Sequence, residues 1–106
     1  MLETKIYIGL NDSETLKQEH DTSKYVSILK HVCYSYHVPF SFAVQQGGYL
    51  HENGDYTEEV SLMLTLIDVP KETINEIAGD LCAFFHQESV LITENEVKAY
   101  FINEKI

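Results

Sequence analysis

A change of hydrophobic period at Pro39 constrains the fold of this chain more than any other feature of its sequence. Before this proline, apolar side chains recur at the spacing of one helical face: Tyr25, Ile28, Leu29, Val32 and Tyr36. After it, apolar side chains alternate with small or polar ones: Phe40, Phe42 and Val44. Proline cannot continue a helix and favours extended backbone in the residue before it. The sequence therefore predicts a helix from Thr22–Ser23 to about His37, followed at once by a half-buried strand.

Two further strand patterns flank this pair of elements. Lys5–Leu10 is short, β-branched and aromatic, and a polar run follows it. Residues 60–67 alternate and are fairly apolar on both faces, which predicts a central strand of a sheet. Gly47-Gly48 and Asn53-Gly54, which precede residues 60–67, are typical of turns. We expect the strand after the proline to pair with residues 60–67 as an antiparallel hairpin with a glycine-rich tip.

The C-terminal part of the chain predicts a second helix and two more strands. Pro70 suits the first position of a helix, where its missing N–H group would have no partner in any case. The core stripe of this helix is formed by Ile74, Ile77, Ala78, Leu81 and Phe85. Beyond it, Ser89–Ile92 and Val97–Ile102 have the composition of short strands around a turn at Glu94–Glu96.

The order of these elements indicates an α+β fold of the ferredoxin-like, split βαβ type. The order is β-α-β-β-α-β with an extra C-terminal strand, and it predicts an antiparallel sheet with two helices on one face. A chain of 106 residues is expected to form a single domain, residues 1–106. The other face of such a sheet is free, so the apolar residues on both faces of residues 60–67 favour a homo-oligomer. The alternative is a monomer whose open face is covered by loops.

The chain has a strong excess of negative charge. It contains 17 acidic residues against 7 basic ones, all of them lysines, for a formal net charge of -10. Without guanidinium groups it lacks the fork that binds a phosphate at two points, which argues against direct binding to nucleic acid or to an anionic membrane. No stretch has the pattern of a secretion leader or a membrane span. We therefore expect a cytoplasmic protein with Cys33 and Cys82 as free thiols.

The predicted hairpin tip gathers side chains that could bind a small ligand or a protein partner: Tyr49, His51, Glu52, Asp55 and Tyr56. Imidazole and carboxylate groups of this kind bind divalent cations or small polar molecules, and loops on a rigid sheet often carry binding residues. The simpler interpretation is a solvated polar turn. We name the tip as the candidate binding site, and we assign no metal, no cofactor and no catalytic residue.

Two other groups have both a functional and a structural interpretation. Cys33 and His37 are four residues apart, as two zinc ligands on one helical turn would be, but no second pair matches them. A packed thiol and a helix-terminal histidine are therefore favoured. Glu88 could act as a base. Its neighbours Gln87 and Ser89 could instead satisfy the carbonyls at the end of the second helix, and this capping interpretation is favoured.

The acidic residues form separate groups along the sequence. One group lies in the loop before the first helix: Asp12, Glu14, Glu19 and Asp21. Another lies on the predicted solvent face of the second helix: Glu72, Glu76 and Asp80. A protein that imitates nucleic acid presents such charges as a continuous track, whereas scattered acidic residues are typical of a solvated surface. The spacing favours the solvated surface.

Four stretches of the sequence, taken together, resemble a known bacterial family. They are the opening Lys5–Leu10, the turn Gly48–Asp55, the stretch Glu59–Leu64 that follows it, and Phe84–Leu91, which contains Gln-Glu-Ser-Val. In these stretches the chain resembles domain-of-unknown-function family 3574. That family is uncharacterised, so the resemblance implies a fold and no reaction.

The sequence favours a non-enzymatic function over an enzyme, because only scattered His, Glu and Tyr residues could support catalysis. Our first hypothesis is a small acidic binding or regulatory module. It would oligomerise through its sheet and engage a protein or a small ligand through the hairpin tip. The alternative is an acidic inhibitor of a nucleic-acid-binding protein, such as a phage-encoded antagonist of a host nuclease.

Overall fold

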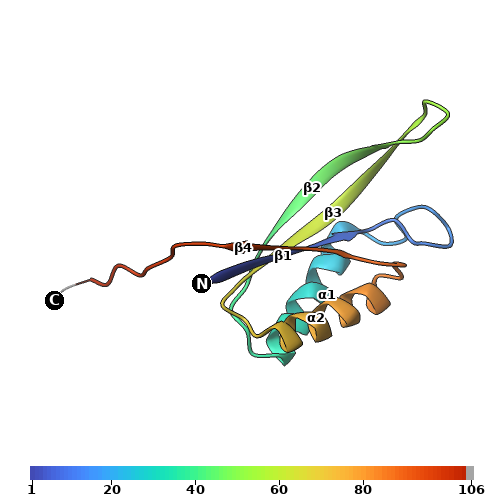
Figure 1. Ribbon diagram of the computed structural model, residues 1–106. Coiled ribbons are helices and arrows are strands. Elements are labelled where there is room, and N and C mark those ends of the chain that lie inside the picture. The colour runs from blue at the N-terminus through green and yellow to red at the C-terminus, as the bar shows by residue number, and fades with distance from the viewer. Residues whose placement is uncertain (105–106) are drawn as a thin grey trace.

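The computed structural model describes residues 1–104, apart from the Tyr49 side chain, and contains the two helices and four strands of the predicted core order. The strands are β1 (Leu2–Gly9), β2 (Ser41–Leu50), β3 (Tyr56–Ile67) and β4 (Leu91–Glu96). The helices are α1 (Thr22–Ser35) and α2 (Lys71–Phe84). The ferredoxin-like α+β fold is confirmed (Figure 1).

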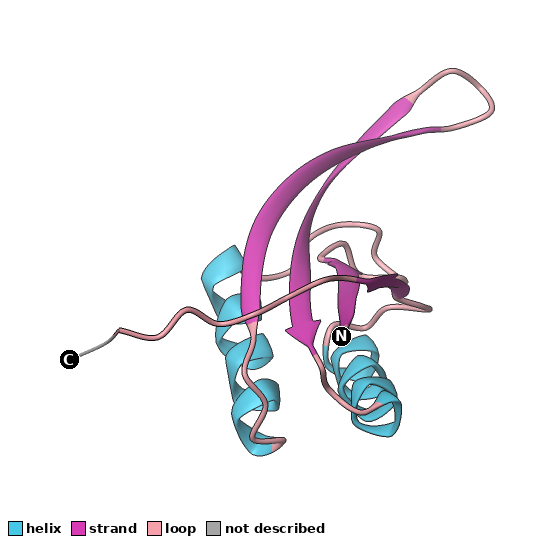
Figure 2. Cartoon of the chain, turned by 60° about the vertical axis from the view of Figure 1, so that its left-hand side comes forward, coloured by secondary structure: helices cyan, strands magenta, loops and turns pink. Residues whose placement is uncertain are grey.

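The four strands form one antiparallel sheet in the order β2-β3-β1-β4. The prediction that residues 60–67 are central is confirmed, since β3 lies between β2 and β1. Both helices cover the same face of this sheet (Figure 2). In the described part of the chain, no helix packs on the opposite face.

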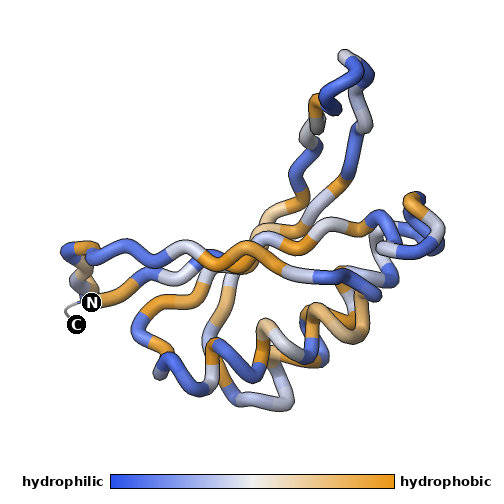
Figure 3. The backbone as a smooth tube through the Cα atoms, turned by 45° about the vertical axis from the view of Figure 1, so that its right-hand side comes forward, coloured by the Kyte–Doolittle hydropathy of each residue, from blue (hydrophilic) through white to orange (hydrophobic). Residues whose placement is uncertain are grey.

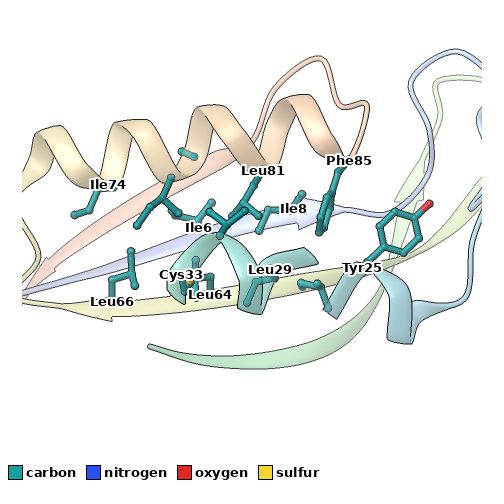
Figure 4. Close-up of a cluster of buried hydrophobic side chains, with 14 of the residues drawn as sticks. Ile6, Ile8, Tyr25, Leu29, Cys33, Leu64, Leu66, Ile74, Leu81 and Phe85 are labelled. Carbon is teal, nitrogen blue, oxygen red and sulfur yellow. The ribbon is translucent and has the colours of Figure 1, made fainter. Parts of the chain in front are cut away.

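The core lies between the sheet and the two helices. Ile6 and Ile8 of β1 and alternate leucines of β3 point toward the helices and are fully buried. Leu29 and Cys33 of α1 and Leu81 of α2 meet them from the other side (Figure 4). Full burial of one such aliphatic side chain stabilises the fold by about 1.5–3 kcal/mol. The apolar stripes read from the sequence are therefore the surfaces that hold the layers together.

Each helix ends at a histidine in the left-handed backbone region. His37 has a φ of 54° and His86 a φ of 53°. The chain reverses at each end, with the N–H of Val38 donating to the carbonyl of Cys33 and the N–H of Gln87 to that of Cys82. Glycine usually occupies this position, because a side chain there costs about 1–2 kcal/mol. The predicted end of the first helix near His37 is confirmed.

The C-terminal part differs from the prediction. Residues 94–96, expected to form a turn, continue β4 and pair with Leu2, Glu3 and Thr4 of β1. The expected extra strand, Val97–Ile102, is absent from the described structure. The reason is that β1 begins at Leu2, earlier than its sequence pattern predicts, and so offers a partner to all of residues 91–96. Beyond Val97, whose N–H donates to the carbonyl of Met1, β1 has no backbone left to pair with.

The hairpin between β2 and β3 is also longer than predicted. Gly47 and Gly48 do not form a turn but lie inside β2, opposite Glu59 and Glu58. The reversal occurs only at Asn53-Gly54, where the N–H of His51 donates to the carbonyl of Asp55 and Gly54 has a φ of 90°. The hairpin therefore extends well beyond the rest of the sheet, and its tip is hydrophilic (Figures 1 and 3).

No helix in the described part of the chain is both long enough and apolar enough to cross a membrane.

Replacing His37 by glycine is expected to raise the free energy of unfolding by about 0.5–1 kcal/mol, because it removes a side chain from the left-handed region. His31 is the matched control, since it is also exposed but lies inside α1. His31→Gly is expected to lower the free energy of unfolding by about 1 kcal/mol. Urea denaturation measures both; a loss of stability in His37→Gly would contradict the assigned helix end.

Candidate functional site

The hairpin tip, which the sequence predicted as the binding site, is an internally bonded turn. Asn53 bonds to Asp55 twice, through its side-chain NH₂ donating to the carboxylate and its carbonyl oxygen accepting from the Asp55 N–H. His51 Nε2 lies 2.7 Å from the hydroxyl of Thr57. Glu52 and Tyr56 are exposed, and the side chain of Tyr49 lies outside the described structure. Among the described residues, no group of three metal-ligating side chains gathers here or elsewhere.

A recess lies at the base of the hairpin, where β2 and β3 pass the loop that follows β1. Its volume is about 460 Å³. Of the predicted tip residues whose side chains the structure describes, only Tyr56 lines it. The described residues that line it are Asn11, Gln18, Gln46, Gly47, Gly48, Tyr56, Glu58, Glu59 and Val60. They comprise side-chain amides, one aromatic ring and two carboxylates, and none of them is basic.

Glu59 is the best-anchored charged group of this recess. Its Oε2 accepts a hydrogen bond of 3.0 Å from the backbone N–H of Asn11. Its carboxylate also lies over Gly9, where a Cβ atom would be only 2.6–2.7 Å from the three carboxylate atoms. The glycine at the end of β1 is therefore what allows this carboxylate to lie against the strand.

Asn11 connects the carboxylate to two other segments. Its backbone carbonyl accepts a hydrogen bond of 2.7 Å from the Gln87 side chain, which follows α2. Its backbone also forms an isolated bridge with Gln18 in the loop before α1. Next to it, the N–H of Leu10 donates to the carbonyl of Val60. Residues 9–11, 59–60 and 87 thus meet at one point, although they are far apart in the sequence.

Gln87 confirms one structural interpretation made from the sequence. Its side chain donates to the carbonyl of Phe85 at the end of α2, as expected of a capping residue, and it also reaches Asn11. Cys33 is a fully buried core thiol, and His37 is exposed at the end of α1. These positions agree with the favoured interpretation of a packed thiol and a helix-terminal histidine. Burial raises the pKa of the Cys33 thiol to about 11, which keeps it protonated and unreactive at neutral pH.

The acidic loop before α1 is ordered by its own carboxylates. Asp12 accepts hydrogen bonds from the backbone N–H groups of Glu14 and Thr15, at 2.8 and 3.2 Å. These bonds, together with His86 at 3.5 Å, lower the pKa of Asp12. Glu19 accepts a hydrogen bond from the hydroxyl of Thr15. Asp21 occupies the N-cap position of α1 but makes no capping bond with its side chain.

The acidic residues of α2 lie in a different region. Asp80 accepts a hydrogen bond of 2.6 Å from the hydroxyl of Tyr36, which ties α2 to the end of α1, while Glu72 and Glu76 are exposed. Since α2 has 14 residues, its first turn is about 20 Å from the end where the acidic loop lies. The hypothesis that these acidic groups imitate nucleic acid stays a prediction, because no contact in the structure tests it.

Sequence reasoning missed Gly9, Asn11 and Glu59 as one group. In the sequence, Gly9 looks like an ordinary strand end, Asn11 like part of a polar loop, and Glu59 like one of many acidic residues. A glycine that ends a β-branched strand was the available signal, because glycine in a strand often marks a close approach of another group.

No protein-family model matches this chain, so the resemblance to domain-of-unknown-function family 3574 stays a prediction. No protein of curated function matches its sequence either.

Solved structures with the same fold include two of a phage SAM lyase. One, in complex with S-methyl-5′-thioadenosine, is 23% identical, with a TM-score of 0.67, covering 90% of this chain and 80% of that one. The apo state is 22% identical, with a TM-score of 0.64, covering 96% and 92%. CutA1 from Pyrococcus horikoshii is 12% identical, with a TM-score of 0.54, covering 98% and 88%. At these identities the likeness shows the fold.

Replacing Gly9 by alanine is expected to displace the Glu59 carboxylate and to lower the free energy of unfolding by about 1 kcal/mol, through loss of its hydrogen bond to Asn11. Gly79→Ala is the matched control, since a Cβ there meets nothing within 4 Å and alanine favours a helix. In a double-mutant cycle measured by urea denaturation, Gly9→Ala should cost nothing further once Glu59 is alanine. Additive effects would contradict the contact.

The Tyr36–Asp80 bond makes a prediction at high pH. The pKa of Tyr36 is raised to about 12, first by donation of its hydroxyl to Asp80 and then by burial and by the charges of Asp80 and Glu76. The neutral hydroxyl is favoured in the folded protein, so its stabilising effect is complete below about pH 10 and is lost as the pH rises through 12. In a spectrophotometric titration, Tyr36→Phe should remove a late-ionising component. A titration curve with the same late component in this variant would contradict the bond.

Proposed function

We propose that this protein is a SAM lyase that binds S-adenosylmethionine in the recess beside Glu59 and cleaves it without water. The single observation that carries the proposal is a carboxylate held in a recess that has side-chain amides and no basic residue among its described lining.

The charge of the recess supports a cationic substrate. S-adenosylmethionine carries a sulfonium and an ammonium group, which outnumber its one carboxylate. Glu58 and Glu59 line the recess of a chain whose formal net charge is -10. Carboxylates in a partly desolvated recess attract cations more strongly than in open water, and a net negative chain raises the local concentration of a cationic ligand.

The size and the polar groups of the recess fit a ligand with a nucleoside part. A volume of about 460 Å³ lies within the range of roughly 300–1,000 Å³ that is usual for such sites. The side-chain amide of Gln46 can offer donors and an acceptor to a base or a ribose. Gln18 can offer its carbonyl oxygen as an acceptor, because its NH₂ group already donates to His20 and Thr22. The ring of Tyr56 supplies an aromatic surface at the wall formed by the hairpin.

The side chains that line the recess suit a reaction that needs orientation more than a protein nucleophile. Its described lining includes no Ser, Cys, His or Lys. S-adenosylmethionine supplies its own nucleophile and leaving group. Its carboxylate oxygen forms a bond to its own Cγ while the bond from Cγ to sulfur breaks, and the electron pair stays on sulfur. The products are neutral S-methyl-5′-thioadenosine and homoserine lactone, with no water, oxidant or added base.

The role of Glu59 in this reaction is to hold the positively charged part of the substrate. By binding the ammonium group, its carboxylate fixes the flexible four-carbon part in the folded conformation that brings oxygen and Cγ together. Correct orientation of two groups of one molecule can account for about 7–11 kcal/mol of a reaction barrier. The phage SAM lyases supply the substrate hypothesis, and the charge and lining of the recess support it in this chain.

A second candidate function is the non-enzymatic binding or regulatory module that the sequence suggested. It would self-associate through its sheet and engage a protein or a small ligand through the hairpin tip. The observation that favours it is the projection of this hairpin beyond the sheet (Figure 2). Glu52 and Tyr56, near the end of the hairpin, are exposed.

Incubation of the purified protein with S-adenosylmethionine, followed by chromatography, distinguishes the two candidates. We expect S-methyl-5′-thioadenosine to accumulate with the wild-type chain. Glu59→Gln is expected to lower kcat/KM at least about 30-fold, because it removes a charge-assisted contact to the substrate. Glu72→Gln is the matched control, with the same change of charge at an exposed position on α2, and it should keep full activity.

Two outcomes would contradict the lyase. If the wild-type chain binds S-adenosylmethionine in calorimetry without forming product, the recess is a binding site only. If it neither binds nor cleaves the compound, the non-enzymatic module is favoured. Equal losses in Glu59→Gln and Glu72→Gln would show that overall charge, and not the recess, governs binding.

A further inference from the structure

The outer edge of β2 lacks the protection that sheet edges usually have. β2 is an edge strand ten residues long, and its sequence contains no Asp, Glu, Lys or Pro. Native sheets protect long edges with charges, prolines, bulges or covering segments, because the free N–H and C=O groups otherwise pair with another chain. The opposite edge strand, β4, carries Glu94 and Glu96. In a chain with 23% charged residues, the uncharged β2 edge is the exception.

A second unpaired element lies at the C-terminus. Val97–Ile102 has a strand-like sequence, and in the described structure its only backbone hydrogen bond is that of Val97 to Met1, the residue before β1. Tyr100, Phe101 and Ile102 are 82%, 84% and 86% exposed. This tail leads away from the body of the protein (Figure 1). A cluster of exposed apolar side chains on a free segment is typical of a surface that another chain covers.

We propose that the tail of one copy of this chain, Val97–Ile102, pairs with the outer edge of β2 in a second copy and extends its sheet by one strand. This inference concerns assembly and does not depend on the proposed reaction.

The lengths of the two elements are compatible. Six tail residues in extended conformation span about 20 Å, and the ten residues of β2 span about 33 Å. The tail can therefore lie along part of the edge over its whole length, with the backbone groups that face β2 paired. Pairing of this kind takes its affinity from main-chain hydrogen bonds and its specificity from alternate side chains.

The distribution of charge indicates a second copy as the occupant. Two chains that each carry a formal charge of -10 repel one another, so any contact between them must avoid their carboxylates. β2 has no charged residue, and the only charged residue of Val97–Ile102 is Lys98. Since neither the tail nor the β2 edge carries a carboxylate, the two can meet without bringing carboxylates together.

Within one chain, part of the tail and the start of β2 line the same recess. Ala99, Tyr100 and Phe101 form one wall of this recess of about 650 Å³, and Phe40 and Ile67 form part of the other. The tail leaves the sheet from the opposite edge strand, β4, and then passes near the first residues of β2. Since each copy has one tail to give and one edge to receive, repeated pairing builds either a closed ring or an open fibre. A closed ring leaves no tail and no β2 edge without a partner, and it is the expected form.

Sedimentation velocity at micromolar concentration tests the proposal on the full chain. The wild-type protein is expected to sediment as a closed oligomer. Replacing Tyr100 and Phe101 by aspartate should give a monomer, and so should Val44→Asp, which places a charge on an exposed position of the β2 edge. Leu16→Asp is the control, because Leu16 is 74% exposed but lies in the loop before α1. It should leave the oligomer intact.

Mixing the two defective variants makes the test independent of folding. The tail variant keeps an intact β2 edge and the edge variant keeps an intact tail, so the mixture should form a heterodimer through one pairing. Circular dichroism verifies that each variant is folded. Amide hydrogen exchange should show slowed exchange at residues 98–102 in the wild-type oligomer only.

Three results would overturn the proposal. A monomeric wild-type chain would show that the tail and the edge do not pair. An oligomer that persists in the tail variant would indicate pairing of β2 with β2 or contact between open sheet faces. A mixture of the two variants that stays monomeric would show that the two surfaces are not partners.

Discussion

The pairing of β1 with its neighbours is the interaction on which the rest of this structure depends. β1 lies between β3 and β4, and it supplies the buried Ile6 and Ile8 to which both helices add their apolar stripes. Because side chains alternate between the two faces of a strand, this register fixes which residues reach the core. A shift by one residue would place Lys5 and Tyr7 against the helices and leave the isoleucines in water.

The same pairing creates the recess at the end of the sheet. β1 ends at Gly9, opposite Ser61 of β3, and the chain then leaves the sheet beside Glu59. The missing side chain of Gly9 lets the carboxylate approach, and the N–H of Asn11 holds it there. Gln87 adds a link to the end of α2. The candidate site is therefore built from strand ends and loops that the core positions, and none of its polar groups is part of the core itself.

The two edge strands of the sheet differ in charge, which the overall composition of the chain does not reveal. The excess of negative charge is spread over the loop before α1, the hairpin, α2 and β4, whereas β2 carries none of it. Some carboxylates bond within the chain, as Asp12 and Asp80 do, so they are not free to face a partner. Carboxylates are absent from residues 22–51, which include α1 and β2, and from Val97–Ile102. Among these stretches, the outer edge of β2 and the tail are the parts that the described structure leaves with unpaired backbone.

The sequence by itself determined the order of the two helices and the first four strands, the ends of α1, the central place of β3 and the apolar stripes of the core. These features depend on local period and on proline, which act over a few residues. Only the tertiary structure decided that β4 includes residues 94–96, that Gly47 and Gly48 lie inside β2, and that Gly9, Asn11 and Glu59 meet. Each of these depends on a partner strand or segment distant in the sequence, and a local pattern contains no information about where that partner begins or ends.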